Sequence, residues 1–395
     1  MDGGTRALVK LFVVKESRPG EKRVALTPAS VAKAKALGYE VEVAAGAGVA
    51  AGFADSAYQE AGATLVGSAA AGAGAGSGAG SGAGAGAGAS PAEVTGAIGK
   101  AEVVASVSPL EPSLASHLSS GAVTISFLQK ERDAATIAAI TQARANALSF
   151  DYLPRISRAQ AADALTSQAI VSGYRVTLVA AGLLPKFFPL YMTAAGTIRP
   201  AKVLVLGAGV AGLQAMATAK KLGAVVSGYD VRAASPDEVK SVGARFVNID
   251  LPPIDGAGGY ARELGEERAK KQQELLAPVI AEQNIVITTA AVPGRPAPLL
   301  VTKQMLAGMA EGSVICDLAA ESGGNVEGSV AGEVVNLSGV TLWGGKDVPS
   351  QMAPDASSLY SGNIVAMLGF ITKDGALNLD KEDEVVRDSA VVLSQ

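Results

Sequence analysis

One short segment in the second half of the chain restricts the possible folds more than any other. Residues 203–224 read VLVLGAGVAGLQAMATAKKLGA: an apolar run, three glycines in the spacing G-x-G-x-x-G, and then a helical pattern. In such a strand–turn–helix unit Gly207 permits the tight turn, Gly209 lets a pyrophosphate approach the backbone, and Gly212 lets the helix lie against the strand. The phosphates then rest on the helix N-terminus. The segment therefore predicts a dinucleotide-binding domain.

An acidic residue follows at the position where such domains bind the ribose. The next apolar run, AVVSGYD, ends at Asp230, 18 residues after Gly212. A carboxylate there accepts hydrogen bonds from the ribose hydroxyls and repels a 2′-phosphate, so it favours NAD over NADP. Arg232 could bind such a phosphate, but Asp230 lies closer to the strand end and should dominate. The nucleotide contacts predicted for this region are Gly207, Ala208, Gly209, Val210, Gly212, Asp230, Val231 and Arg232.

The same alternation of apolar runs and helical stretches extends along most of the chain. In the first half the runs are ALVKLFVVK, YEVEVAAG, EVVASV and AVTISF, with helical stretches beginning near Pro28 and Ala134. From Lys202 onward they are VLVLG, AVVSGYD, ARFVNI, IVITTA, SVICDL and VTLWG. Each series is a βαβ pattern, which predicts a parallel sheet. The expected fold is therefore α/β, with two Rossmann-like, doubly wound domains separated by a cleft.

Chain length also favours two domains, because 395 residues exceed what one ordinary core holds. We expect residues 1–165 with 351–395 to form the first domain, onto which the C-terminal residues pack back, and 166–350 to form the nucleotide-binding domain. Residues 69–90 are low-complexity Gly/Ala/Ser, which predicts a flexible surface insertion; silk-like stacking would need many chains side by side. The segment LPPIDGAGGYARELGEERAKK is expected to begin as a mobile loop and continue as a charged helix.

Composition and charge exclude several classes of protein. The 33 basic and 37 acidic residues are spread along the chain with a net charge of −4, so there is no basic stripe for a nucleic acid partner. No uninterrupted apolar run of about 20 residues could span a bilayer, so we expect a soluble chain. The single cysteine, Cys316, cannot form an internal disulfide, and the start MDGGTRALVK lacks a secretory signal. These features indicate a reducing compartment, with Cys316 buried on a strand; no metal site is predicted.

A polar segment ahead of the nucleotide-binding domain is a second candidate site. Residues 154–168, PRISRAQAADALTSQ, contain no His, Cys or Lys. Ser157 followed by Gln160 three residues later matches a capping box, so a helix is expected to start at Arg158. The side chains that could then hold a carboxamide or a ribose are Arg155, Gln160, Asp163, Thr166 and Ser167. Taken alone, the pattern also fits a capped surface helix with an Arg–Asp pair.

Eight stretches of the sequence are similar to a known family. They are ESRPGEKRVALTP, GYEVEVAAGAGVAAGFAD, PRISRAQAADALTSQ, MTAAGTIRPAKVLVLGAGVAGLQAMATAKKLGA, YDVRAA, GGYARELGEE, ITTAAVPGRPAP and DLAAESGGN. Together they resemble the NAD(H)-binding domain I of proton-translocating nicotinamide nucleotide transhydrogenase. The similarity covers nearly the whole chain apart from the Gly/Ala insertion, and the element RISRAQ is distinctive.

The resemblance implies roles for particular residues. In that family the loop corresponding to RISRAQAAD reaches toward the nicotinamide ring, which places cofactor contacts on Arg155, Ile156, Ser157, Gln160 and Asp163. The implied catalytic residues are Arg155, Gln160, Asp163 and Thr166, where Thr166 stands in place of a family serine. The family's mobile loop, which would close over bound nucleotide, corresponds to the segment around Gly258, Gly259 and Tyr260. Gln272 and Ala291 align with further nucleotide contacts.

The resemblance also implies a reaction that needs partners. NADH bound to this chain would pass hydride to NADP⁺ held on a separate NADP(H)-binding domain, and a membrane domain would carry the proton path. The chain has one dinucleotide fingerprint, so these parts must come from elsewhere. A homodimer is expected, with apolar helices of the nucleotide domain at its interface. The implied location is the soluble, peripheral part of an inner-membrane complex, on the mitochondrial matrix or bacterial cytoplasmic side.

The closest competing interpretation is alanine dehydrogenase, which shares the architecture and the RVALTP element containing Arg23. That enzyme needs a lysine and a histidine to handle its oxo acid. Ser106 and Ser108 stand where the lysine would fall, and Gln129 where the histidine would fall. The single histidine, His117, lies elsewhere, in a solvated loop or helix. Direct hydride transfer between two nicotinamide rings needs no such proton relay. A catalytically silent NAD-binding module is the third interpretation.

Overall fold

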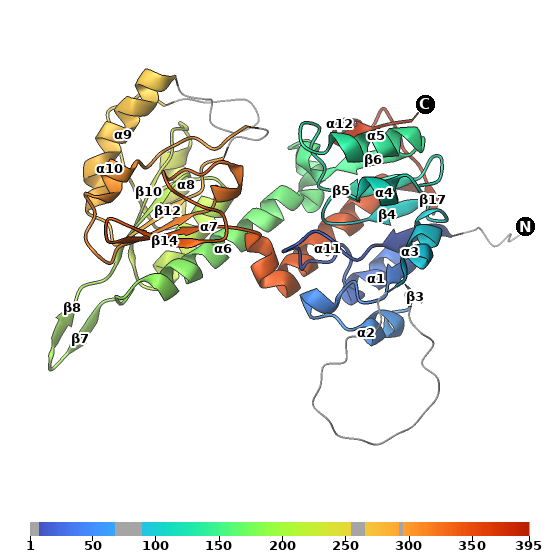
Figure 1. The fold of residues 1–395 in the computed structure, drawn as a ribbon, viewed down its shortest axis with the longest axis horizontal. Helices are drawn as coiled ribbons and strands as arrows, with labels where there is room; N and C mark the ends of the chain where they lie inside the picture. The colour runs from blue at the N-terminus through green and yellow to red at the C-terminus, as the bar shows by residue number, and fades with distance from the viewer. Residues whose placement is uncertain (1–7, 68–88, 254–264, 292–294, 395) are drawn as a thin grey trace, which may run out of the picture. The chain divides into compact units, whose positions relative to one another are not determined.

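The computed structural model describes residues 8–67, 89–253, 265–291 and 295–394, and the chain divides into two compact units. Unit 1 comprises Met1–Ser167 and Ala353–Gln395, and unit 2 comprises Gln168–Met352. Each unit is built around one seven-stranded sheet (Figure 1). The two parallel-dominated sheets confirm the α/β fold class predicted from the sequence. The predicted loop residues Gly258, Gly259 and Tyr260 and most of the Gly/Ala insertion lie outside the described residues.

The sheet of unit 1 has the strand order β18-β6-β5-β4-β1-β2-β3. Its strands are β1 (Val9–Val13), β2 (Tyr39–Ala44), β3 (Thr64–Val66), β4 (Val103–Ala105), β5 (Val123–Ser126), β6 (Asn146–Ser149) and β18 (Ala390–Val392). All neighbours pair in parallel except β18, which runs antiparallel to β6. The order reverses between β1 and β4, so the loops that follow these two strands meet at the switch point of a doubly wound sheet.

Helices surround this sheet and return the C-terminus to it. They are α1 (Pro28–Ala36), α2 (Asp55–Glu60), α3 (Pro91–Ile98), α4 (Pro112–Ala115), α5 (Ala134–Gln142), α11 (Ala353–Phe370) and α12 (Glu384–Ser389), with the 3-10 turns η1 (Val49–Ala51), η2 (Phe150–Tyr152) and η3 (Ser157–Ala162). The helices predicted near Pro28 and Ala134 are confirmed, and Pro28 occupies the first turn of α1, where its missing N–H costs nothing. Because α11 packs on α1 and η3, and β18 extends the sheet, the C-terminal residues do pack back on the first unit. A two-stranded ladder, β16 (Thr372–Lys373) and β17 (Ala376–Leu377), lies between α11 and α12.

The sheet of unit 2 has the order β11-β10-β9-β12-β13-β15-β14. Its strands are β9 (Lys202–Leu206), β10 (Val225–Tyr229), β11 (Arg245–Phe246), β12 (Ile285–Thr288), β13 (Val314–Asp317), β14 (Val334–Leu337) and β15 (Val340–Gly344). Val203 and Val205 of β9 belong to one buried cluster, while Leu204 and Leu206 belong to another. Alternate residues of a strand point to opposite faces, so both faces of this sheet are covered. Cys316 on β13 is fully buried as predicted, and burial raises the pKa of its thiol.

The helices of unit 2 include the one that directly follows the glycine turn. They are the part of α6 (Ala164–Leu183) from Gln168 onward, α7 (Val210–Lys221), α8 (Ser235–Ser241), α9 (Glu266–Ala281) and α10 (Lys303–Leu306), with the 3-10 turns η5 (Ala320–Ser322) and η6 (Val348–Met352). The charged helix expected in GEERAKK is α9. A hairpin of β7 (Tyr191–Thr193) and β8 (Gly196–Ile198), visible in Figure 1, was not predicted. Within the described residues, no helix has both the length and the hydropathy to cross a membrane.

Candidate functional site

The glycine turn between β9 and α7 has the geometry that its sequence predicts. Gly207 adopts a φ of +104°, which side-chain-bearing residues rarely reach. A Cβ at Gly212 would collide with the carbonyl oxygen of Gly207, so this glycine is what lets α7 lie against the strand. A Cβ at Gly209 would meet no described atom within 4 Å. Gly209 is the residue before the first turn of α7, where free N–H groups favour an anion.

An acidic cluster lies beside this turn at the carboxyl end of β10. Asp230 accepts a hydrogen bond from the backbone N of Ala208 at 2.7 Å and from the backbone N of Arg232 at 2.9 Å. Arg232 Nε also donates to Asp230 at 3.2 Å, and its Nη2 donates to Glu238 and to the Ala208 carbonyl, both at 2.9 Å. Two carboxylates therefore neutralise one guanidinium. The surplus negative charge opposes a 2′-phosphate and leaves Asp230 as the natural acceptor for ribose hydroxyls.

Glu238, which bonds to Arg232, is a member of this acidic cluster that the sequence analysis missed. It lies in the first turn of α8, six residues after Arg232, and its side chain is 37% exposed. An acidic residue in the first turn of a helix ordinarily indicates compensation of the helix dipole. The signal that could have identified it is the spacing, because a turn from a strand end into a short helix places such a residue near the strand's own carboxyl end.

The other residues predicted to contact the nucleotide differ in how far their side chains are buried. Gln272 on α9 is only 3% exposed and donates from Nε2 to the Tyr229 hydroxyl at 3.2 Å, so it holds the side chain of the last residue of β10. Burial raises the pKa of Tyr229, and the Gln272 bond partly opposes this. Ala291 is exposed just after β12, as is Val210 at the start of α7, whereas Ala208 is buried and Val231 is partly buried.

Two side chains that the sequence analysis did not single out hold backbone groups in the described residues that follow β12. Asn325 is fully buried and donates from Nδ2 to the carbonyl oxygens of Ala290 at 2.9 Å and Pro298 at 2.8 Å. Its own backbone N donates to Asp317, a fully buried carboxylate that also accepts from Thr288 Oγ1 at 2.9 Å. This network sets the backbone on which Ala291 lies.

In unit 1, the predicted capping box is wrong. Ser157–Ala162 form the 3-10 turn η3, whose N-cap residue is Ile156 without a side-chain hydrogen bond, and α6 begins only at Ala164. The cap of α6 is Asp163, which accepts from the backbone N of Thr166 at 2.9 Å and from Thr166 Oγ1 at 2.6 Å. A carboxylate cap bonded twice outcompetes the Ser157 hydroxyl for the start of the helix.

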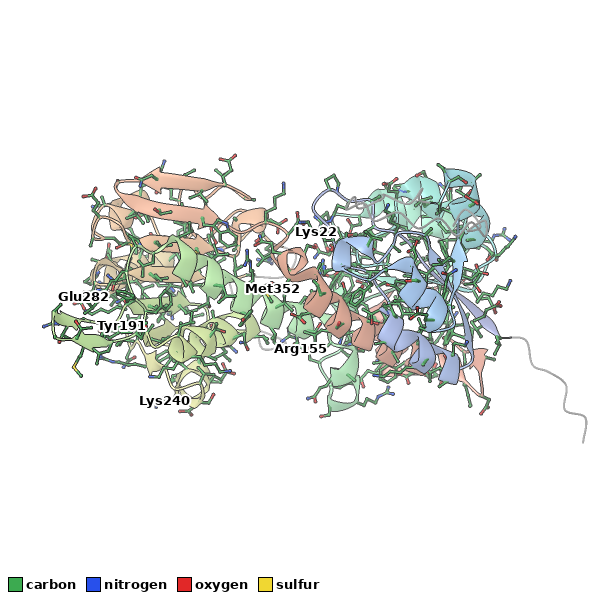
Figure 2. The ribbon with its side chains drawn as sticks, turned by 90° about the horizontal axis from the view of Figure 1, so that it is seen from below. Lys22, Arg155, Tyr191, Lys240, Glu282 and Met352 are labelled. Carbon is green, nitrogen blue, oxygen red and sulfur yellow. The ribbon has the colours of Figure 1, made fainter. Side chains whose placement is uncertain are left out.

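The structure brings together part of the predicted polar cluster. Asp163 and Thr166 are joined directly, whereas Gln160 is exposed on η3 and Arg155, labelled in Figure 2, is exposed just before it. Ser157 is also exposed and Ile156 is partly buried. Ser167 is buried and bonds elsewhere, to Asn363 Oδ1 at 2.7 Å. Because the Thr166 hydroxyl donates to Asp163, it can only accept a hydrogen bond from a carboxamide N–H.

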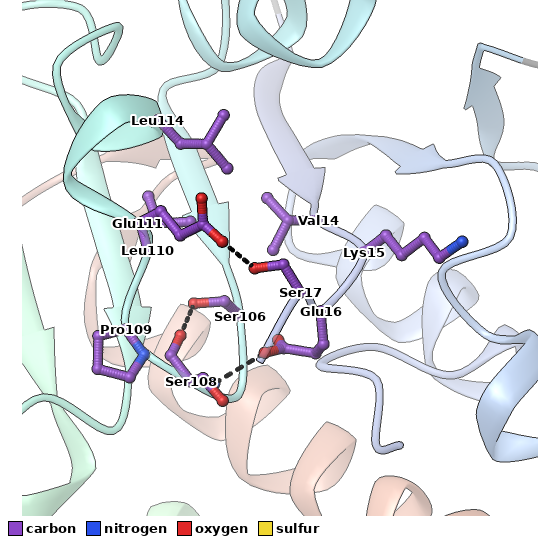
Figure 3. A pocket seen from close by; sticks show the side chains of 10 residues that line it. All are labelled: Val14, Lys15, Glu16, Ser17, Ser106, Ser108, Pro109, Leu110, Glu111 and Leu114. Atoms are coloured by element: carbon purple, nitrogen blue, oxygen red, sulfur yellow. Dashed lines mark hydrogen bonds between the residues drawn. The ribbon is translucent and has the colours of Figure 1, made fainter. Parts of the chain in front are cut away.

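In unit 1, hydroxyl and amide groups stand at the positions considered above for the lysine and histidine of alanine dehydrogenase: Ser106 and Ser108 follow β4, and Gln129 follows β5. Ser106 Oγ donates to the carbonyl oxygen of Ser108 at 2.6 Å, and Gln129 Nε2 donates to Asp151 at 3.0 Å. Glu16, after β1, accepts from the backbone N of Val107 at 2.6 Å and of Ser108 at 3.1 Å. Figure 3 shows the bond between Glu16 and Ser108. Burial raises the pKa of Glu16 to about 7. This titratable carboxyl was missed, while His117 is exposed as expected.

The strand order, the glycine turn and the carboxylate at the end of β10 together define a class. A doubly wound sheet with these three features binds a dinucleotide across the carboxyl ends of its strands. The protein is therefore a two-unit α/β protein of the dinucleotide-binding class.

Comparison with known proteins narrows this class. The model of the alanine dehydrogenase/PNT C-terminal domain matches residues 176–395, and that of the N-terminal domain matches 12–75 and 70–172. The chain is 42% identical to the first part of the NAD(P) transhydrogenase alpha subunit of Rhodospirillum rubrum, over 97% of this chain and 98% of that protein. The structure of transhydrogenase from Sinorhizobium meliloti matches with a TM-score of 0.82 and 39% identity, over 98% of this chain and 99% of that one. Alanine dehydrogenase of Bacillus subtilis is more distant, 26% identical over 80% of this chain and 71% of that protein. The chain belongs to the family of NAD(P) transhydrogenase alpha subunits.

Proposed function

We propose that this chain is the NAD(H)-binding component of a proton-translocating NAD(P) transhydrogenase, and that it passes hydride from NADH to NADP⁺ held on a partner domain. The observation that carries the proposal is the acidic end of β10 beside the glycine turn. There Asp230 bonds to the backbone N of Ala208 at 2.7 Å, and Arg232 is bonded to Asp230 and Glu238. This arrangement favours binding of NAD(H) and disfavours binding of NADP(H). In the proposed reaction, NADP(H) is bound by the partner domain.

The proposed cofactor contacts follow from the two sites. The pyrophosphate binds the turn from Gly207 to Gly212, with Ala208 and Val210 beside it, and the ribose binds Asp230, with Val231 and Arg232 beside it. Gly259, Tyr260, Gln272 and Ala291 complete the proposed nucleotide contacts. The proposed nicotinamide contacts are Arg155, Ile156, Ser157, Gln160, Asp163 and Thr166.

For this reaction the protein has to hold and polarise the nicotinamide rings, and it does not have to transfer protons. A hydride that passes directly between two nicotinamide rings leaves no proton on the protein, so positioning and electrostatics supply the catalysis. Arg155 and Gln160 offer N–H donors to the carboxamide oxygen, and Thr166 offers an acceptor to the carboxamide N–H because its own proton is bound by Asp163. The site therefore orients the carboxamide and, through it, the ring plane.

The reaction requires other subunits. The names of the relatives imply a complex with the remaining transhydrogenase subunits. We place the NADP(H)-binding domain and the membrane domain, with its proton path, among those partners. The chain would then be a soluble, peripheral part of an inner-membrane complex, on the mitochondrial matrix or bacterial cytoplasmic side.

A second copy of this chain is the further partner that we propose. Both strands of the β7–β8 hairpin are exposed and pair only with each other in the described residues. An isolated two-stranded hairpin is marginally stable in water. The exposed apolar side chains on and next to this hairpin are Phe187, Leu190, Tyr191, Met192 and Ile198. Because these side chains gather here, we propose the hairpin rather than the helices of unit 2 as the homodimer interface. In a twofold-symmetric dimer, the same apolar patch of each copy would cover that of the other.

The function is tested by titration and reconstitution. The purified chain should bind NADH tightly and NADPH weakly. The change in dihydronicotinamide fluorescence on titration measures both affinities. Hydride transfer from NADH to an NADP⁺ analogue should appear only when the NADP(H)-binding partner is added. Ready oxidation of alanine by the chain alone would establish the alanine dehydrogenase alternative instead. NADH binding without transfer in the presence of the partner would identify a silent NAD-binding module.

A further inference from the structure

The segment that carries Arg155 and Gln160 has little internal support. η3 is six residues long, whereas 3-10 runs beyond three or four residues are uncommon because their hydrogen-bond geometry is poor. Its N-cap residue provides no side-chain hydrogen bond. Arg155 and Gln160 are both exposed, so the backbone decides where their side chains can reach. The conformation of this segment must therefore depend on contacts from other parts of unit 1.

One buried side chain on α11 contacts both sides of the turn from η3 into α6. Asn363, 6% exposed, donates from Nδ2 to the Ala161 carbonyl at 2.9 Å and accepts at Oδ1 from Ser167 Oγ at 2.7 Å. Ala161 and Ser167 flank Asp163, the cap of α6. The two partners fix the orientation of the amide, because exchanging its oxygen and nitrogen would set two acceptors against each other at Ala161. Asn363 thus ties the end of η3 to the first turn of α6.

A second contact, also from the C-terminal part of unit 1, holds η3 nearer its start. Arg158 Nη1 donates to Asp383 Oδ2 at 2.9 Å, Arg158 Nη2 donates to Asp383 Oδ1 at 2.5 Å, and the guanidinium lies 5.5 Å from the centre of the Phe370 ring. The hydrogen bonds from Arg158 lower the pKa of Asp383. The pair is partly exposed, so its contribution to global stability is small and its effect is local.

From these contacts we infer that Asn363 is a positioning residue for hydride transfer. It sets the backbone of residues 155–163 and, through that backbone, the reach of Arg155 and Gln160, while the Arg158–Asp383 pair holds the other end of η3. The bond from Asn363 to Ala161 spans 202 residues of sequence, so α11 determines the geometry of a loop in the middle of the chain. The inference rests on the function proposed above for Arg155 and Gln160.

The sharpest test is Asn363→Asp, which keeps the size of the side chain and sets an oxygen against the Ala161 carbonyl. We expect hydride transfer to an NADP⁺ analogue, measured with the full chain and its NADP(H)-binding partner, to slow by about 10- to 100-fold, as displaced catalytic groups do. The dissociation constant for NADH should change by less than about threefold. The matched control is Asn378→Asp, the same change at an exposed position of the same C-terminal part, which should alter neither quantity. Equal losses in binding and transfer would overturn the inference.

Hydrogen–deuterium exchange supplies a readout that does not depend on transfer. In Asn363→Asp, peptides covering residues 155–167 should exchange faster than in the wild-type chain, while those covering β4, β5 and β6 should not change. Unchanged exchange at 155–167, or faster exchange with an unchanged transfer rate, would overturn the inference. If Asn363→Asp unfolds unit 1, Asp383→Asn serves in its place, and a transfer rate equal to that of the wild type would count against positioning.

The exchange experiment also separates failure of this inference from failure of the proposed function. A wild-type chain that binds NADH but transfers nothing with its partner would disprove the function. In that event positioning would still be supported if NADH slows exchange of residues 155–163 in the wild type and not in Asn363→Asp. It would be overturned if NADH protects the segment equally in both.

Discussion

Arg232 and Asp230 form an ion pair of 3.2 Å directly beside the glycine turn, and the same arginine bonds to Glu238 at 2.9 Å. The side chains of Arg232 and Asp230 are only 15% and 10% exposed, so this pair is more than a surface contact. An arginine at this position can accommodate a 2′-phosphate in enzymes that use NADP. Here it is turned toward the acidic groups of its own unit, which is the physical basis for expecting NAD(H) at this site.

Removing the Asp230 carboxylate should weaken NADH binding. Asp230→Ala loses the acceptor for the ribose hydroxyls and releases the Ala208 N–H that Asp230 binds at 2.7 Å. The expected loss of binding free energy is about 1–3 kcal/mol, measured by calorimetric titration with NADH. Asp237→Ala is the control, because the side chain of Asp237 is 94% exposed on α8. An affinity equal to that of the wild type would show that the ribose does not bind here.

The preference for NADH over NADPH should weaken when Glu238 no longer neutralises the Arg232 guanidinium. Glu238→Gln keeps the shape of the side chain but removes one of the two carboxylates that neutralise the guanidinium. NADPH affinity should rise by about tenfold, corresponding to one charge-assisted hydrogen bond made available to a phosphate. NADH affinity should change by less than about threefold. Parallel titrations with both coenzymes measure this, and an unchanged preference would mean that Arg232 does not face the bound nucleotide.

The two exposed donors of the unit 1 loop should matter more for transfer than for binding. Arg155→Ala and Gln160→Ala each remove a group proposed to orient the nicotinamide carboxamide. We expect the transfer rate with the NADP(H)-binding partner to fall by about 10- to 100-fold, with a much smaller change in NADH affinity. Stopped-flow transfer kinetics and fluorescence titration give the two quantities. Equal effects on both would show that these residues bind the coenzyme without orienting it.

Stability should depend on pH through Glu16, whose pKa burial raises from 4.5 to about 7. Between these values the folded chain binds more protons than the unfolded chain, so the free energy of unfolding falls as pH rises, and above pH 7 the cost is complete. Gln at this position mimics the protonated form. Relative to the wild type, Glu16→Gln should therefore gain about 1–3 kcal/mol between pH 5 and pH 8.

Urea unfolding at the two pH values measures this difference. The matched control is Glu60→Gln, because Glu60 is exposed at the end of α2. A pH dependence that is the same in Glu16→Gln and the wild type would show that another group causes it.

The oligomeric state should respond to a charge on the hairpin. Met192 is 73% exposed on β7, and Met192→Asp would place a carboxylate within the proposed self-complementary interface. We expect the sedimentation coefficient to fall from that of a dimer to that of a monomer at micromolar concentration. Val49→Asp is the control, because Val49 is 61% exposed and belongs to unit 1, whereas the hairpin belongs to unit 2. A dimer that persists in Met192→Asp would move the interface elsewhere.

Local patterns determined much of the fold. The apolar runs predicted β1, β2, β4 and β5 of one sheet and β9 to β13 and β15 of the other, because a buried parallel strand needs a continuous apolar segment. The strands β3, β6, β14 and β18 were not predicted. The glycine turn was equally local, since the φ of Gly207 and the contact at Gly212 belong to one strand–turn–helix unit. The β7–β8 hairpin was missed because its strands are three residues long and exposed, so they carry no burial pattern.

The tertiary structure decided which of several local possibilities holds. The sequence predicted a cap at Ser157 with Gln160, whereas the helix is capped by Asp163, between the two residues, Ala161 and Ser167, to which Asn363 of α11 bonds. The sequence alone left the role of Arg232 open, and in the structure its guanidinium bonds to Glu238 of α8. It gave no sign that Glu16 would meet the N–H groups of Val107 and Ser108. Hydrogen bonds between residues far apart in the chain have no period or spacing along it, so the fold alone selects them.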